Sequence, residues 1–267
     1  MNEIALFGLA AFRWVLLLIV LMTAIVLVEA WIGHYRSDFP LRAQYAPFVV
    51  GGLLILAAFA FGVAPASSIA RGALRWVGWL TVITGVVGAA YHHYYGIVEK
   101  AGGYRLLLHY LMYGAPQLAP LALSALGAVA VVLTSSDGDS DVPARALLII
   151  TGVALGGAVM QAGILHFRGA FNSPLMYAPV TLPMLAILLA IWTAVRPDRG
   201  LAVIAQLSFL ATFLMGFVGL GMHLRGVERQ MGGAYLFRIN LLQGPPPLAP
   251  AMFSGLAALG MIASRSL

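Results

Sequence analysis

Cysteine is absent from the 267 residues of the chain, and charged residues are scarce at 9%. Without a thiol, disulfide bonds, thiolate catalysis and cysteine-ligated zinc or iron–sulfur clusters are excluded. A soluble domain usually contains about 25% charged residues. Here 61% of residues are hydrophobic and the mean hydropathy is +0.95. Too little polar surface remains to face water, so the composition predicts a membrane protein.

Several sequence motifs are also absent. The chain has no Walker A loop, no Rossmann glycine pattern and no HExxH sequence, so it gives no indication of the nucleotide sites or zinc hydrolase site that these motifs form. The formal net charge is +6, but the basic residues are spread singly between apolar runs. Such residues are typical of loops that contact lipid headgroups, and nucleic acid is not an expected partner.

Eight apolar runs account for most of the chain. Each is close to the ~20 residues that a helix needs to cross about 30 Å of hydrocarbon. Their hydrophobicity is continuous rather than alternating, which excludes a membrane barrel. We therefore predict an all-α integral membrane protein with eight transmembrane helices. The runs cover residues 11–33, 46–64, 76–95, 115–134, 146–167, 177–195, 202–224 and 246–263.

The eight runs form two tandem groups of four. We predict one four-helix repeat over residues 1–135, an acidic linker over 136–145 and a second four-helix repeat over 146–267. Since each repeat has an even number of spans, both enter the membrane in the same direction. The two repeats should therefore be related by a pseudo-two-fold axis along the membrane normal.

Matching glycines and prolines support the duplication. The segment from His93 to Pro120 aligns with that from His223 to Pro250 without a gap, which predicts that His93 is the equivalent of His223. A second pair of matching segments begins at His34 and His166.

Histidine ends each odd-numbered run, which places imidazoles at one depth near one membrane face. Neutral imidazole binds haem iron, and two imidazoles that face each other within one half would suit bis-histidine ligation. We expect His34, His93, His166 and His223 to be the metal and cofactor ligands. The alternative is an interfacial belt or a set of helix caps. Because duplication also copies structural residues, both interpretations stay open.

Arginine follows the histidine two residues later in three copies, at Arg36, Arg168 and Arg225, whereas Tyr95 takes this place in the fourth. A guanidinium donates two parallel hydrogen bonds to a carboxylate, so these arginines are expected to hold haem propionates or a partner. The alternative is that they extend to the membrane interface.

Glu29 lies about one helical turn inside the first run, and Gln161 is its equivalent in the second half. A carboxylate inside a membrane is costly and usually functional, so we expect Glu29 to be a catalytic proton-relay group for a quinol near His34. The alternative is a polar contact between Glu29 and Gln161 that joins two helices.

These features favour an integral membrane subunit of a bacterial respiratory or electron-transfer complex. It would anchor extrinsic subunits and exchange electrons with quinone, through b-type haem at the histidine layer. Its outline is similar to that of the quinol-interacting membrane subunits of some molybdopterin oxidoreductases, a similarity of topology that does not fix function. A cofactor-free scaffold that docks partners on its His/Arg-rich loops remains an alternative. A small-molecule or ion pathway is less favoured.

The expected location is the bacterial inner (cytoplasmic) membrane, with lipid and other subunits of a larger complex as partners. An even number of spans places both termini on one face and the histidine ends on the other. Lysine and arginine divide almost equally between the two faces, so the positive-inside rule discriminates weakly. We expect the termini in the cytoplasm.

Overall fold

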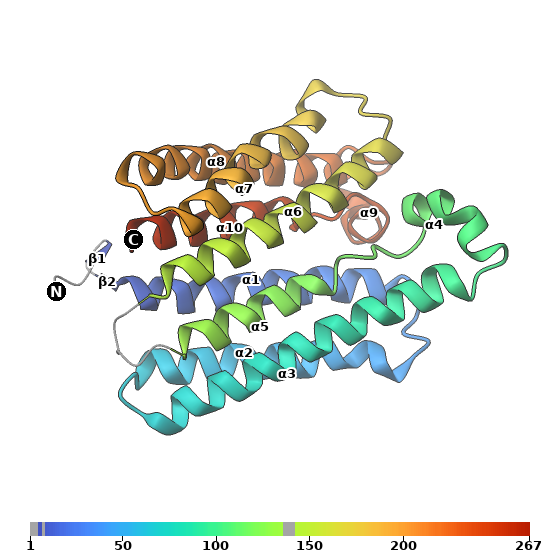
Figure 1. Cartoon of the computed structure of the whole chain (residues 1–267). Helices are drawn as coiled ribbons and strands as arrows, with labels where there is room; N and C mark the ends of the chain where they lie inside the picture. Colours follow the sequence, from blue (N-terminus) through green and yellow to red (C-terminus); the bar gives the residue numbers. More distant parts are fainter. Residues whose placement is uncertain (1–4, 7–8, 136–141) are drawn as a thin grey trace.

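The computed structural model describes residues 5–6, 9–135 and 142–267 and is almost entirely helical (Figure 1). Two short strands, β1 (Ala5–Leu6) and β2 (Leu9–Ala10), pair antiparallel before the first helix. Most of the predicted acidic linker, residues 136–141, lies outside the described residues.

The helices of the two halves have the same order and similar lengths. The first half contains α1 (Ala11–Tyr35), α2 (Ala46–Val63), α3 (Ser68–His93), α4 (Leu107–Tyr113) and α5 (Leu121–Leu133), with short turns η1 (Arg42–Tyr45), η2 (Tyr94–Val98) and η3 (Gly103–Leu106). The second half contains α6 (Ala144–Arg168), α7 (Ala178–Val195), α8 (Arg199–Glu228), α9 (Phe237–Gln243) and α10 (Ala249–Arg265), with η4 (Pro174–Tyr177) and η5 (Gly233–Leu236).

Among the described residues, six helices are long and apolar enough to cross a membrane, which confirms the prediction of a helical membrane protein at this level. They cover Ala11–Tyr35, Arg42–Val63, Ser68–Val98, Ala144–Arg168, Pro174–Val195 and Arg199–Glu228. The other two predicted spans contain the shorter helices α5, with 13 residues, and α10, with 17. Both helices begin after proline-rich segments, because proline lacks an N–H and restricts the residue before it.

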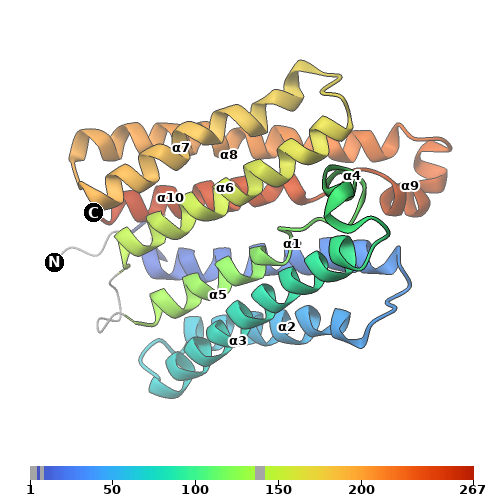
Figure 2. The same ribbon diagram turned by 45° about the vertical axis from the view of Figure 1, so that its right-hand side comes forward.

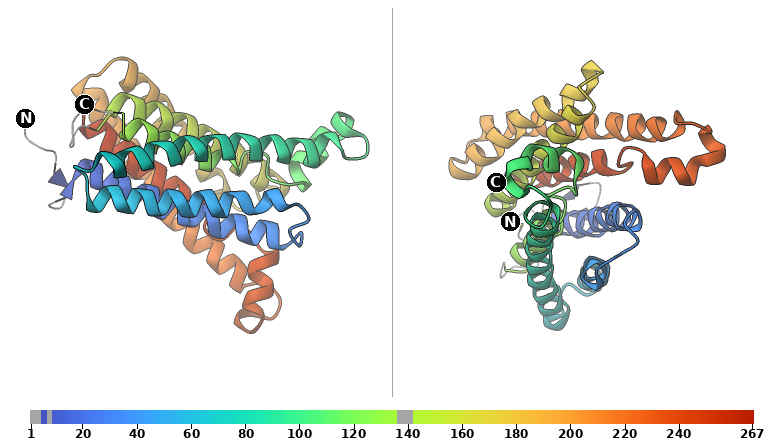
Figure 3. Two further views of the ribbon diagram at one scale, coloured as in Figure 1. Left: turned by 90° about the horizontal axis from the view of Figure 1, so that it is seen from below. Right: turned by 90° about the vertical axis from the view of Figure 1, so that its right-hand side faces the viewer.

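Four helices form the centre of the molecule. α1 packs against α5 and α10, and α6 packs against the same two helices. The pair α2 and α3 flanks this centre on one side and the pair α7 and α8 on the other, so that the two halves lie side by side (Figure 1, Figure 3). The outer helices expose apolar side chains such as Phe59, Trp76, Leu188 and Leu207. A surface of this kind is suited to contact with lipid.

The chain enters and leaves this bundle at one end. α1 begins and α10 ends there, while α4 and α9 lie at the opposite end, which we call the histidine end because α1, α3, α6 and α8 finish there (Figure 1, Figure 2). Side chains fix the starts of two long helices: Ser67 accepts the N–H of Ala70 at 3.2 Å and Asp198 accepts that of Leu201 at 3.0 Å. Such N-caps satisfy donors that have no partner within the helix.

Glycines allow the last helix of each half to touch its neighbour closely. A Cβ on Gly85 would lie 2.7 Å from the backbone nitrogen of Ser124, and a Cβ on Gly216 would lie 2.8 Å from that of Ser254. Each serine also donates to a backbone carbonyl of the facing helix, at 3.0 and 2.8 Å. Small residues permit this approach in membrane helices. These contacts identify Gly85 with Gly216 and Ser124 with Ser254.

The first half contains one residue more than the second between these contacts and the following loop. The extra residue lies in η2, a π-helical turn in which Glu99 N–H donates to the carbonyl of Tyr94 at 2.9 Å. A π-turn absorbs an inserted residue without breaking the helix. The gap-free alignment of the segments that begin at His93 and His223 is therefore wrong.

Candidate functional site

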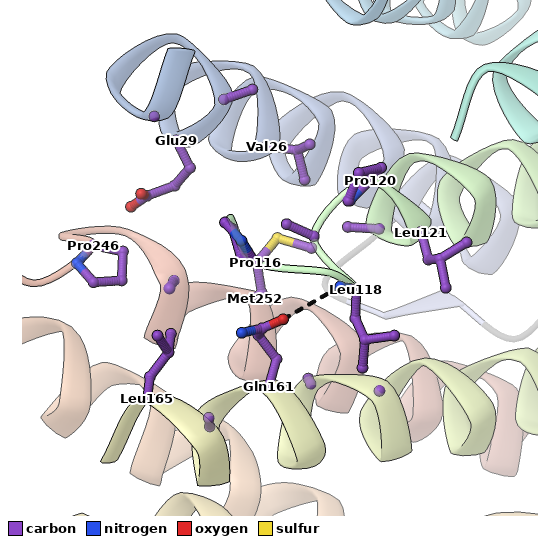
Figure 4. Close-up of a pocket in the computed structure, with 18 of the residues that line it drawn as sticks. Val26, Glu29, Pro116, Leu118, Pro120, Leu121, Gln161, Leu165, Pro246 and Met252 are labelled. Atoms are coloured by element: carbon purple, nitrogen blue, oxygen red, sulfur yellow. Dashed lines mark hydrogen bonds between the residues drawn. The ribbon is translucent and has the colours of Figure 1, made fainter. Parts of the chain in front are cut away.

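Both halves line one large cavity of about 2780 Å³. α1, α5, α6 and α10 contribute apolar residues to it, among them Val26, Leu121, Leu165 and Met252 (Figure 4). The histidine end contributes the polar and charged lining, which includes His34, His92, His166 and His223. The cavity thus combines an apolar interior with polar groups at one end, as sites for amphipathic ligands do.

Of the five histidines that line the cavity, four form two pairs, and the fifth, His109 in α4, is exposed. The ring centroids of His34 and His92 lie 6.0 Å apart, and those of His166 and His223 lie 6.3 Å apart. Each pair joins the first and third long helices of one half, and all four rings are half-buried.

His92 occupies the place that the sequence alignment predicts for His93. His92 Nδ1 lies 2.9 Å from the carbonyl oxygen of Pro116, as His223 Nδ1 lies 2.7 Å from that of Pro246. His93 is exposed and does not line the cavity, and its Nε2 lies 2.6 Å from the hydroxyl of Tyr104. The residue inserted at the π-turn shifts the helical register by one position. His92 therefore lines the cavity, and His93 lies outside it.

Three of the four paired histidines have the same tautomer. A carbonyl oxygen only accepts hydrogen bonds, so an Nδ1 next to it carries the hydrogen, and Nε2 of the neutral ring keeps a lone pair. Metal-binding histidines are commonly held in this manner. The donors are His92 to Pro116, His166 to Met176 and His223 to Pro246, at 2.9, 2.9 and 2.7 Å.

His34 has the opposite tautomer. Its Nδ1 lies 3.1 Å from Nε2 of Gln44, and the backbone N–H of Leu41 donates to Oε1 of the same amide at 3.1 Å. The second bond fixes the orientation of the amide, so Gln44 donates and His34 Nδ1 accepts. The neutral His34 ring therefore carries its hydrogen on Nε2.

Glu29 and Gln161 each contact the backbone of the opposite half. The Glu29 carboxylate accepts a hydrogen bond from the N–H of Leu248, just before α10. Gln161 Oε1 accepts one from the N–H of Leu118, just before α5, at 3.3 Å (Figure 4). Figure 4 shows both side chains directed into the same space between α1 and α6. The structure does not show the alternative, a direct contact between Glu29 and Gln161. Each side chain bonds a backbone N–H instead.

Two arginines also contact residues of the opposite half. Arg36 Nη2 donates to the carbonyl of Gly244 at 3.1 Å, and the Arg168 guanidinium lies 5.5 Å from the centre of the Tyr113 ring. Burial lowers the pKa of Arg36, an effect that the Glu29 charge opposes and the Arg168 charge reinforces. Arg225 is exposed and does not line the cavity.

The charged lining of the cavity favours an anionic group. Arg36, Lys100 and Arg168 are basic, and Glu29 is the acidic residue among the described residues that line it. In a cavity of low polarity, such an excess of positive charge attracts carboxylates and phosphates.

In the described part of the chain, no three or more histidine and carboxylate side chains are grouped to hold a metal ion by themselves. Haem needs fewer protein ligands, because the porphyrin provides four of the six. Two imidazoles on opposite sides of one iron, each about 2.0 Å from it, would have ring centroids about 6 Å apart. Both histidine pairs have this separation.

The sequence interpretation left two residues of this site without a role. His92 was visible only as the neighbour of His93, and nothing in the sequence separates the two. Gln44 carried no motif. Comparison with known proteins gives no match to a protein-family model, a curated protein or a solved structure.

Proposed function

We propose that the chain is an integral membrane subunit of a bacterial electron-transfer complex that binds haem b and exchanges electrons with quinone. The observation that carries this proposal is the two pairs of neighbouring imidazoles, with Nδ1 groups held by hydrogen bonds, at the basic end of an apolar cavity. An apolar cavity suits the ring and tail of a quinone, and the basic groups suit haem propionates.

In the membrane, we propose eight crossings in two tandem repeats about a pseudo-two-fold axis along the membrane normal. The matching element order and the matching Gly85–Ser124 and Gly216–Ser254 contacts support the repeat. α5 and α10 would complete their crossings together with the irregular segments before them. The location proposed is the bacterial inner membrane with cytoplasmic termini. The histidine end would then lie on the opposite membrane face, and extrinsic subunits would dock on it.

The proposed chemistry is the oxidation of a quinol. It releases two electrons and two protons. Haem b, held by the histidines, would supply the one-electron redox chemistry, and an extrinsic redox protein would be the final electron acceptor. Neutral imidazoles at the cavity are suited to accept the protons. A proton-relay role for Glu29 stays a prediction, since its carboxylate already bonds the N–H of Leu248.

The basic residues have distinct proposed roles. Arg36 and Arg168 line the cavity and would hold propionates, because each has guanidinium N–H groups beyond its present contact. Arg225 is exposed at the same end and would contact a partner subunit.

A quinol-reduction assay tests the proposal. A short-chain quinol is added to the purified, oxidised full chain in detergent, and the haem α band is followed. We expect the band to appear with the quinol and not with the matching quinone. A haem that is reduced by dithionite but never by quinol would overturn the quinone part. A protein that contains no haem would overturn the proposal as a whole.

A further inference from the structure

We infer that the two histidine pairs bind different ligands: His166 and His223 hold the haem iron, whereas His34 and His92 hold a quinone oxygen by hydrogen bonds. This inference rests on the proposed function and assigns its two cofactors to separate halves. Its basis is the difference in hydrogen-bonding between the two pairs.

His166 and His223 present two unprotonated ring nitrogens. His166 Nδ1–H donates to the carbonyl of Met176, and His223 Nδ1–H donates to that of Pro246, so Nε2 is unprotonated in both neutral rings. Two unprotonated nitrogens cannot hydrogen-bond to each other. A metal ion accepts both lone pairs at once, and the 6.3 Å centroid separation is close to the roughly 6 Å expected for two imidazoles that share one iron.

His34 and His92 present one hydrogen-bond donor and one acceptor. The Gln44 amide holds the His34 hydrogen on Nε2, while the bond from His92 Nδ1 to Pro116 leaves the Nε2 of His92 unprotonated. A quinone carbonyl accepts from the former, and a quinol hydroxyl donates to the latter. Iron ligation by His34 would require its hydrogen to move to Nδ1, where it would face the NH₂ group of Gln44.

One side-chain difference separates the halves. Gln44 precedes Tyr45 at the end of η1, and Met176 precedes Tyr177 at the corresponding place in η4. His34 bonds the side chain of Gln44, whereas His166 bonds the backbone carbonyl of Met176. Methionine has no amide that could impose the His34 tautomer.

The test is a reciprocal exchange of these residues, read by haem content per protein and by quinone affinity. We expect Met176→Gln to lower haem content at least fivefold, because the new amide would donate to Nδ1 of His166. We expect Gln44→Met to keep the haem content and weaken quinone binding about tenfold. His166→Ala and His34→Ala are the corresponding deletions, and His93→Ala is the control that should change neither quantity.

Each outcome decides the assignment. Loss of haem in Gln44→Met or His34→Ala, with haem retained in Met176→Gln and His166→Ala, would reverse it. Equal loss in both sets would show that the pairs are not specialised, while the proposed function would survive. Wild-type protein without haem or quinone would overturn both. A thermal unfolding midpoint near that of wild type identifies the variants that are folded.

Discussion

The carboxylate of Glu29 in α1 accepts a hydrogen bond from the backbone N–H of Leu248, 219 residues further along the chain. The corresponding amide of Gln161 in α6 accepts the N–H of Leu118. Each half therefore satisfies a backbone donor that precedes the last helix of the other half. Separation of the halves would leave both donors unsatisfied, so these bonds link the two halves across the cavity.

Replacement of Glu29 tests this link. Glu29→Ala should lower the free energy of unfolding by roughly 1–2 kcal/mol, because the N–H before α10 loses its acceptor. Glu29→Gln keeps a side-chain oxygen and should retain most of the stability. The thermal unfolding midpoint in detergent measures both. If Glu29→Ala unfolds like wild type, the bond to Leu248 does not link the halves. If Glu29→Gln is as stable as wild type but oxidises quinol tenfold more slowly, Glu29 also transfers protons.

Close contact between α8 and α10 gives a second prediction. Gly216→Ala would place a methyl group 2.8 Å from the carbonyl oxygen of Pro250, and overpacking of this kind costs roughly 1–3 kcal/mol. Gly221 lies on the same helix with nothing within 4 Å of a Cβ, so Gly221→Ala should be neutral or slightly stabilising. Equal unfolding midpoints for the two variants would contradict the close packing of α8 on α10.

The π-turn at η2 leads to a third prediction. His92→Ala should weaken quinone binding about tenfold, since it removes a good hydrogen bond worth about 1.4 kcal/mol. His93→Ala should change it less than twofold, because His93 is exposed and bonds Tyr104. Titration of the purified protein with a short-chain quinone measures both affinities. A larger effect at His93 would show that the sequence alignment, and not the π-turn, identifies the site residue.

Arg36 provides a fourth prediction. Arg36→Ala should increase the rate of haem loss about tenfold, because a hydrogen bond from a charged group contributes roughly 1.5–3 kcal/mol. Arg225→Ala is the matched control: the residue is exposed, does not line the cavity, and should leave haem retention unchanged. Transfer of haem to excess apomyoglobin measures the rate. Faster loss from the Arg225 variant alone would place the propionates elsewhere.

Much of the fold could be predicted from the sequence because lipid allows few solutions. A long apolar run must form a helix to satisfy its backbone groups, and six such helices are present in the part of the chain that the structure describes. Helix ends were harder to predict. In the runs at 115–134 and 246–263, prolines delay the start of the helix, and hydrophobicity alone carries no signal for that delay.

The site was less predictable, for two physical reasons. An inserted residue at a π-turn leaves the composition and the hydrophobic periodicity almost unchanged. Helix geometry therefore decides whether His92 or His93 lines the cavity. Partners such as the N–H of Leu248 and the carbonyl of Met176 belong to the backbone, which every residue has. Sequence patterns identified the histidine end, and only three-dimensional packing identified the partner of each side chain.

The reduced-minus-oxidised visible spectrum of the purified wild-type chain tests the central claim most directly. The proposed site predicts Soret and α bands of a low-spin b-type haem, which disappear in His223→Ala while the protein stays folded. Featureless spectra from protein purified from haem-sufficient cells, with no quinone in its lipid extract, would contradict an electron-transfer role for the histidine layer.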